Sequence, residues 1–126
     1  MERKEFLIKA ISDDKNKLKK EDAAGLCDWS LTCHYLAKLV GEMGEELCNE
    51  FKIEGYKVEP YQSETQNFDH LIGRGVDVSM CGDSESKMLE NCKSFVKKAS
   101  SFFNVSVHFK GWIGIRRKYI FHLQLK

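Results

Sequence analysis

The chain has 126 residues, of which 42% are hydrophobic and 31% charged, and its formal net charge is +1. A chain of this length and composition predicts one folded domain with a single core, and it excludes disordered and fibrous classes. No run of about 18 apolar residues occurs, which excludes a transmembrane helix among the predicted elements. The apolar run at residues 6–8 is too short for a signal-peptide core, so we expect a cytoplasmic protein.

The first part of the chain predicts two helices. Residues 2–11 place their apolar side chains on one helical stripe, although an edge strand is an alternative there. Asp28 is the predicted N-cap of a second helix, in which apolar residues recur every three or four positions: Trp29, Cys33, Leu36, Val40, Met43, Leu47 and Phe51. Gly41 and Gly44 interrupt this stripe, so we expect a break or a close helix contact there.

The middle of the chain predicts two strands and a third helix. Residues 52–59 and 71–80 show the composition or alternation of strands, and the polar residues 61–67 between them predict a loop. Asp83 or Ser84 is expected to cap the helix that follows. Its apolar face runs from Met88 to Phe103.

The last part of the chain predicts a β-hairpin. Residues 105–110 and 119–125 alternate between apolar and polar side chains, and Gly111 to Gly114 are expected to turn or kink the chain between them. The element order favours a single two-layer α+β domain over residues 1–126. We expect a mostly antiparallel sheet of four to five strands, with two or three helices on one face.

The five cysteines predict reduced thiols rather than a metal site. An odd number without a secretion signal is typical of a reducing compartment, and most of these thiols are expected in the core. Zinc usually requires paired ligand units, whereas Cys27, Cys33 and His34 form a single C-x5-C-H spacing. We therefore predict neither a metal nor a cofactor. The five are Cys27, Cys33, Cys48, Cys81 and Cys92.

Charge is distributed unevenly along the chain. Residues 21–69 carry eleven acidic and three basic residues, whereas residues 91–126 carry eight basic residues and no acidic one. Surfaces of opposite sign steer association, so we predict a small protein-binding module without catalytic activity, acting by occlusion as inhibitor and immunity proteins do. Head-to-tail self-association into a homodimer is compatible with the same pattern. The predicted acidic face consists of Glu42, Glu45, Glu46 and Glu50.

A nucleic-acid-binding hairpin is the alternative. Basic side chains hold phosphates and aromatic rings stack on bases, and the C-terminal segment interleaves the two. The sequence pI of 7.6 lies below the value above roughly 9 that is typical of nucleic-acid binders, which argues against this alternative. The predicted basic face consists of Lys110, Trp112, Arg116, Arg117 and Lys118.

A small phosphodiesterase or nuclease is the second alternative. His108 and His122 fall on polar positions of neighbouring predicted strands, where two imidazoles could face each other and perform general acid–base chemistry. Two-histidine phosphodiesterases usually carry Ser or Thr two residues after each histidine, and this chain has Lys110 and Gln124 there. Both histidines are therefore weak catalytic candidates.

Overall fold

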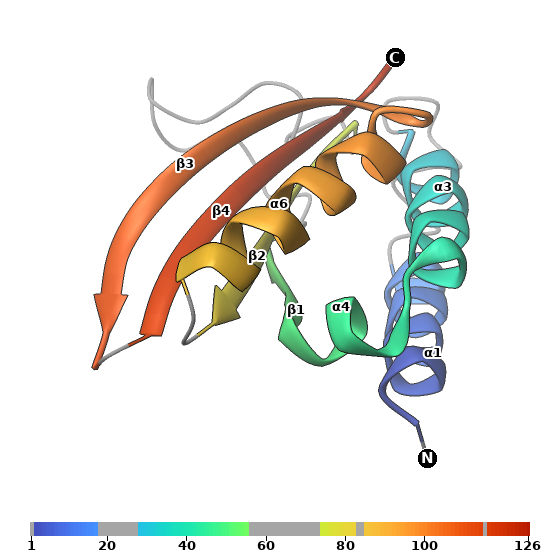
Figure 1. Ribbon diagram of the computed structural model, residues 1–126. Helices are drawn as coiled ribbons and strands as arrows, with labels where there is room; N and C mark the ends of the chain where they lie inside the picture. Colours follow the sequence, from blue (N-terminus) through green and yellow to red (C-terminus); the bar gives the residue numbers. More distant parts are fainter. Residues whose placement is uncertain (1, 18–27, 56–73, 83–84, 115) are drawn as a thin grey trace.

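The computed structural model describes residues 2–17, 28–55, 74–82, 85–114 and 116–126 (Figure 1). In this part of the chain the helices are α1 (Arg3–Lys17), α3 (Trp29–Glu42), α4 (Glu45–Glu50) and α6 (Glu85–Ala99). The strands are β1 (Phe51–Gly55), β2 (Gly75–Gly82), β3 (Phe103–Ile113) and β4 (Arg116–Leu125).

The four strands form one open sheet in the order β1-β2-β4-β3, and every neighbouring pair is antiparallel. Helix α6 lies across the concave side of this sheet, and α3 packs beside α6 with α1 alongside it (Figure 1). The arrangement is the two-layer α+β class that the element order predicts.

The core lies between the sheet and the helices. Val76, Val78 and Met80 of β2 point to the helices and are fully buried, as are Phe121 and Leu123 of β4. The intervening residues of these strands face the opposite side of the sheet, because successive strand side chains alternate. This second face, away from α6, carries the polar groups of the candidate site.

The segment from Trp29 to Phe51 forms two helices, and the break falls at Gly44, one of the two glycines where a break or a close contact was expected. Helix α3 ends at Glu42, and extended backbone at Met43 and Gly44 separates it from α4. Met43 and Leu47 remain buried on both sides of the break, which is why the apolar spacing continues across it. Phe51 begins β1 instead of ending a helix.

The boundary between α6 and β3 also differs from the prediction. Helix α6 ends at Ala99, and the Phe102 amide donates to the Ala99 carbonyl at 3.0 Å to turn the chain. Phe103 then opens β3 and is buried there. Its apolar side chain fits the helical spacing and the strand alternation equally well, so the pattern alone did not place the boundary.

Two glycines shape the hairpin of β3 and β4. Gly111 has a φ of 104° at a register shift that follows Phe109, and Gly114 has a φ of 62° in the turn. Residues that carry a side chain rarely adopt such positive φ angles, so glycine is required at both positions. The predicted turn or kink between Gly111 and Gly114 is thus a bulge followed by a tight turn.

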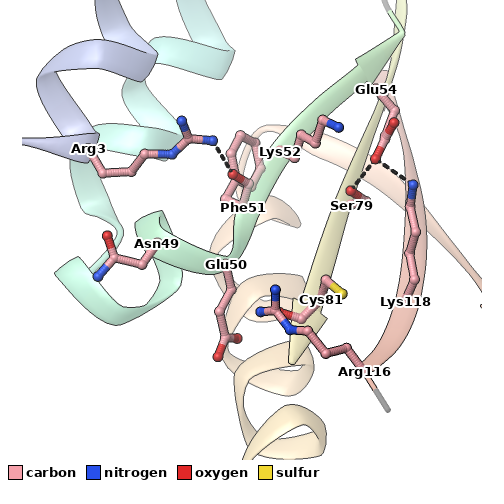
Figure 2. Close-up of a pocket in the computed structure, with 10 residues that line it drawn as sticks. All are labelled: Arg3, Asn49, Glu50, Phe51, Lys52, Glu54, Ser79, Cys81, Arg116 and Lys118. Atoms are coloured by element: carbon pink, nitrogen blue, oxygen red, sulfur yellow. Dashed lines mark hydrogen bonds and ion pairs between the residues drawn. The ribbon is translucent and has the colours of Figure 1, made fainter. Parts of the chain in front are cut away.

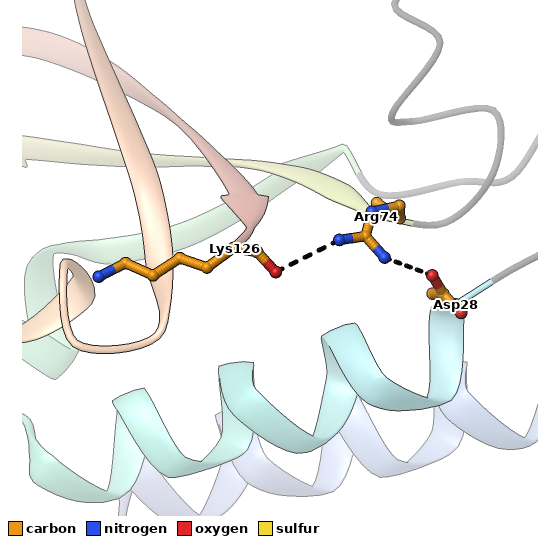
Figure 3. A network of polar contacts seen from close by, with 3 residues as sticks. All are labelled: Asp28, Arg74 and Lys126. Atoms are coloured by element: carbon orange, nitrogen blue, oxygen red, sulfur yellow. Dashed lines mark hydrogen bonds and ion pairs between the residues drawn. The ribbon is translucent and has the colours of Figure 1, made fainter.

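Arg74 joins three ends of elements (Figure 3). Its guanidinium group forms an ion pair with Asp28 at 2.5 Å and donates to the Lys126 carbonyl at 3.4 Å. Asp28 is the N-cap residue of α3, as predicted, although its side chain makes no capping hydrogen bond. The pair is partly exposed, and such pairs contribute about 1 kcal/mol or less. It holds the start of β2 against the start of α3.

The described cysteines, Cys33, Cys48, Cys81 and Cys92, are all free, and all but Cys81 are buried. Burial, and then the nearby Glu50 carboxylate, raise the pKa of the Cys92 thiol to about 11, which disfavours its reactive thiolate. Across the described ranges, no helix combines the length and apolar character that a membrane crossing needs. The predicted loop at 61–67, the caps Asp83 and Ser84, and Cys27 lie outside the described residues.

Candidate functional site

A hollow of about 270 Å³ opens where the α4–β1 junction meets β2 and the start of β4 (Figure 2). Arg3 reaches it from α1, so four regions of the chain contribute to one site. Its lining is mostly polar and charged: Arg3, Asn49, Glu50, Phe51, Lys52, Glu54, Ser79, Cys81, Arg116 and Lys118.

A three-residue polar network crosses the sheet at this hollow. One carboxylate oxygen of Glu54 accepts a hydrogen bond from the Ser79 hydroxyl at 2.6 Å and forms an ion pair with Lys118 at 2.7 Å (Figure 2). Antiparallel pairing of β1 with β2 and of β2 with β4 brings the three side chains together. Burial raises the pKa of Glu54, but hydrogen bonds from Lys118 and Ser79 outweigh it and the net shift is downward. Glu54 is therefore ionised at neutral pH.

Two guanidinium groups are fixed at the hollow by backbone carbonyls. Arg3 donates to the Phe51 carbonyl at 2.8 Å and to the Cys48 carbonyl at 3.3 Å (Figure 2 draws the first of these). Arg116 donates to the Cys81 carbonyl at 2.9 Å. A carbonyl carries no formal charge, so the contacts to Phe51 and Cys48 position the Arg3 guanidinium group without neutralising it.

Among the described residues of the lining, four cationic side chains stand against two carboxylates, which is an excess of positive charge. Glu54 is engaged by Lys118, and Glu50 accepts a hydrogen bond from the Asn91 amide at 2.9 Å. An anionic group of a ligand is the natural complement of such a lining, because charge-assisted hydrogen bonds to arginine are among the strongest polar contacts.

One of the predicted acidic residues lines this hollow, and the other three precede it along the chain. Glu50 lines it, and Glu45 and Glu46 are exposed on α4 directly before it. Glu42 is exposed at the end of α3. Glu46 forms an ion pair with Lys87 of α6 at 2.5 Å, so part of this negative charge is compensated locally.

Only part of the predicted basic face comes together at the hollow. Arg116 and Lys118 line it, so they meet Glu50 of the acidic set there. Arg117 lies opposite Trp112 in the register of the hairpin. The side chains of Lys110 and Trp112 lie outside the described part of the structure.

The two candidate histidines share one face of the sheet but are not directly opposite each other. The register places Ser106 opposite His122 and His108 opposite Ile120, so the two imidazoles are offset along the strands. His122 instead contacts Asp77 of β2, with 2.9 Å between its Nδ1 and the carboxylate. His108 is exposed on the edge strand. This arrangement orients His122 toward Asp77.

Sequence reasoning did not single out Glu54, Ser79 or Arg3 as site residues. Alternation along β2 indicated that Ser79 faces away from the core, but the partner across the sheet depends on the β1–β2 register, which no local pattern encodes. Arg3 reaches carbonyls more than 40 positions away. A cation near a helix start carries no signal for such a contact.

Acid should weaken the fold partly through Glu54. A lowered carboxyl pKa contributes stability above the unfolded-state value, near 4.3, and this contribution disappears as pH falls through the folded value. We therefore expect Glu54→Gln to flatten the loss of unfolding free energy below about pH 4.5. Urea unfolding at successive pH values measures this, with the exposed Glu42→Gln as the control. A slope identical to that of the native chain would contradict the assignment.

Comparison with known proteins gives no relative from which a role could be transferred. No family model matches the chain, and neither a curated protein nor a solved structure does.

Proposed function

We propose that this chain is a non-catalytic binding domain that holds a protein partner through an acidic side chain seated in the hollow. The observation that carries the proposal is the fixed position of Arg3, whose guanidinium group donates to the Phe51 and Cys48 carbonyls in the same lining as Arg116. The planar fork of arginine matches a carboxylate with two parallel hydrogen bonds. Prior positioning of the fork reduces the entropy that binding costs.

The charge around the hollow favours a protein over a nucleic acid. Helix α4 contributes Asn49 and Glu50 to the hollow, and it also carries the exposed Glu45 and Glu46. A phosphate backbone entering the hollow would approach these carboxylates within the Debye length of about 8–10 Å and be repelled. A protein surface can instead present an acidic group to the hollow and a basic group to α4.

Occlusion of the partner is the mode of action that fits these features. Complementary charge raises the rate of association and selects the partner, while surrounding contacts exclude water. A small domain that covers a functional surface in this way inhibits without chemistry of its own. The proposal therefore assigns no catalytic step to His108 or His122.

A displayed library of random peptides tests the chemistry of the hollow directly. We expect peptides selected on the native chain to be enriched in Asp and Glu. A synthetic copy of one such peptide should bind Arg116→Glu at least about tenfold more weakly, since a charged hydrogen bond contributes about 1.5–3 kcal/mol. Lys93→Glu, which reverses an exposed cation of α6 outside the hollow, should leave the affinity unchanged.

An oligothymidylate in the same titration distinguishes the nucleic-acid alternative. We expect no binding at about 50 mM salt, the condition that favours phosphate contacts. Tight, strongly salt-dependent binding of this oligonucleotide, weakened by Arg116→Glu, would replace the proposal with the alternative. Equal loss of peptide binding in Arg116→Glu and Lys93→Glu would show that the hollow is not the site.

A further inference from the structure

The sheet leaves its longest strand at an edge. Strand β3 has 11 residues and pairs with β4 on one side, and no strand in the described part of the chain pairs with its other side. An edge strand presents backbone N–H and C=O groups that can pair with a further strand. Proteins usually protect such edges with charge, bulges or short length.

The two edges of this sheet differ in that protection. Strand β1 has five residues, carries Lys52 and Glu54, and has a register shift between Ile53 and Gly55. Strand β3 has no Asp, Glu, Lys or Arg from Phe103 to Phe109, and its bulge comes only after that segment. The β1 edge is thus protected against pairing with a further strand, whereas the β3 edge offers a regular neutral segment of seven residues.

An exposed apolar patch lies along the β3 edge. Val107 is 45% exposed and Phe109 is 53% exposed, although both lie on the face that the helices cover elsewhere. Helix α6 crosses β2 and β4, and β3 extends beyond it (Figure 1). The Phe109 ring lies against Tyr119 with 5.3 Å between ring centroids, so the patch extends onto β4.

We propose that β3 pairs with β3 of a second copy of this chain, antiparallel and around a twofold axis at Val107. The two four-stranded sheets then become one continuous sheet. This inference rests on the edge of β3 that no strand of the described residues pairs with, and it is independent of the hollow and its proposed ligand.

The sequence of β3 is compatible with itself in this alignment. With the axis at Val107, Val105 lies beside Phe109 of the second copy on the apolar face, and Ser106 lies beside His108 on the polar face. Apolar cross-strand pairs stabilise a sheet, and like charges directly opposite destabilise it. Self-pairing brings no acidic pair and no Lys or Arg pair together between Phe103 and Phe109. A charged peptide would find no ion-pairing partner along this segment.

Analytical ultracentrifugation from about 1 µM to 1 mM measures the association of the native chain. We expect a monomer–dimer equilibrium, and we expect Val107→Lys to weaken it at least about tenfold because two lysines then face each other at the axis. Leu31→Lys is the matched control, since Leu31 is 44% exposed and lies on α3, outside β3. It should dimerise as the native chain does.

A mixture of Val107→Lys and Val107→Asp should restore dimerisation, because opposite charges then meet at the axis. Exchange of the β3 amides in the native chain should slow as concentration rises, a readout that needs no variant. A native chain that stays monomeric would overturn the proposal, as would β3 amides whose hydrogen exchange does not change with concentration. Equal dimerisation of folded Val107→Lys and Leu31→Lys would also overturn it. Failure of the charge-paired mixture to associate would reject the axis at Val107.

Discussion

Replacing Phe95 with alanine is expected to lower the free energy of unfolding by about 3–5 kcal/mol. Phe95 is fully buried on the face of α6 that meets the sheet. Its ring centroid lies 4.8 Å from that of Phe121 in β4 and 5.8 Å from that of Phe51 in β1. Removing the ring loses the apolar transfer energy and also leaves a cavity among three elements, which the surrounding backbone cannot fully close.

Urea unfolding followed by circular dichroism measures this loss as a lower midpoint with an unchanged slope. A loss of this size corresponds to a fall in melting temperature on the order of 10–20 °C for a domain of this length. Phe6→Ala is the matched control, because Phe6 is 51% exposed on α1 and should cost within about 1 kcal/mol. Similar losses in the two variants would mean that α6 does not close the core.

The position of Phe95 was predictable from sequence, whereas the ends of its helix were only partly so. Met88, Cys92, Phe95 and Ala99 recur at helical spacing, and all four are buried against the sheet. The C-terminal boundary was not encoded in this pattern, since Phe103 is apolar in either a helix or a strand. Where two periodicities agree on one residue, backbone hydrogen bonding decides the element.

The hairpin was predictable because its sequence signals are local. The candidate site was not predictable, since its residues are far apart in the sequence. Alternation in β3 and β4 and the glycines at 111 and 114 specify the hairpin within about 20 residues. Glu54, Ser79 and Lys118 come from three strands whose order depends on the whole sheet. Counts of charge along the chain indicated acidic and basic segments, but the register brings Glu50 and Arg116 to the same hollow.

The contact between α1 and α3 leads to the second large effect on stability. Trp29 is fully buried at the start of α3, and its indole N–H donates to the Asp14 carbonyl near the end of α1 at 3.0 Å. One side chain thus supplies both apolar burial and a hydrogen bond between two helices. These helices lie next to each other at one side of the sheet (Figure 1). We expect Trp29→Ala to cost about 3–5 kcal/mol, because the indole leaves a cavity and the carbonyl loses a donor.

Trp29→Phe separates these two contributions. It keeps an aromatic ring in the core and removes the indole N–H, so its cost should include about 0.5–1.5 kcal/mol for the hydrogen bond and remain well below that of Trp29→Ala. Urea unfolding monitored by circular dichroism measures both, and amide exchange in α1 should accelerate in both variants if the contact holds that helix in place. An α1 whose exchange is unchanged in Trp29→Ala would show that it is anchored elsewhere, for example through the Arg3 contacts to Phe51 and Cys48. In that case the hollow, rather than the helix pair, is what ties α1 to the sheet.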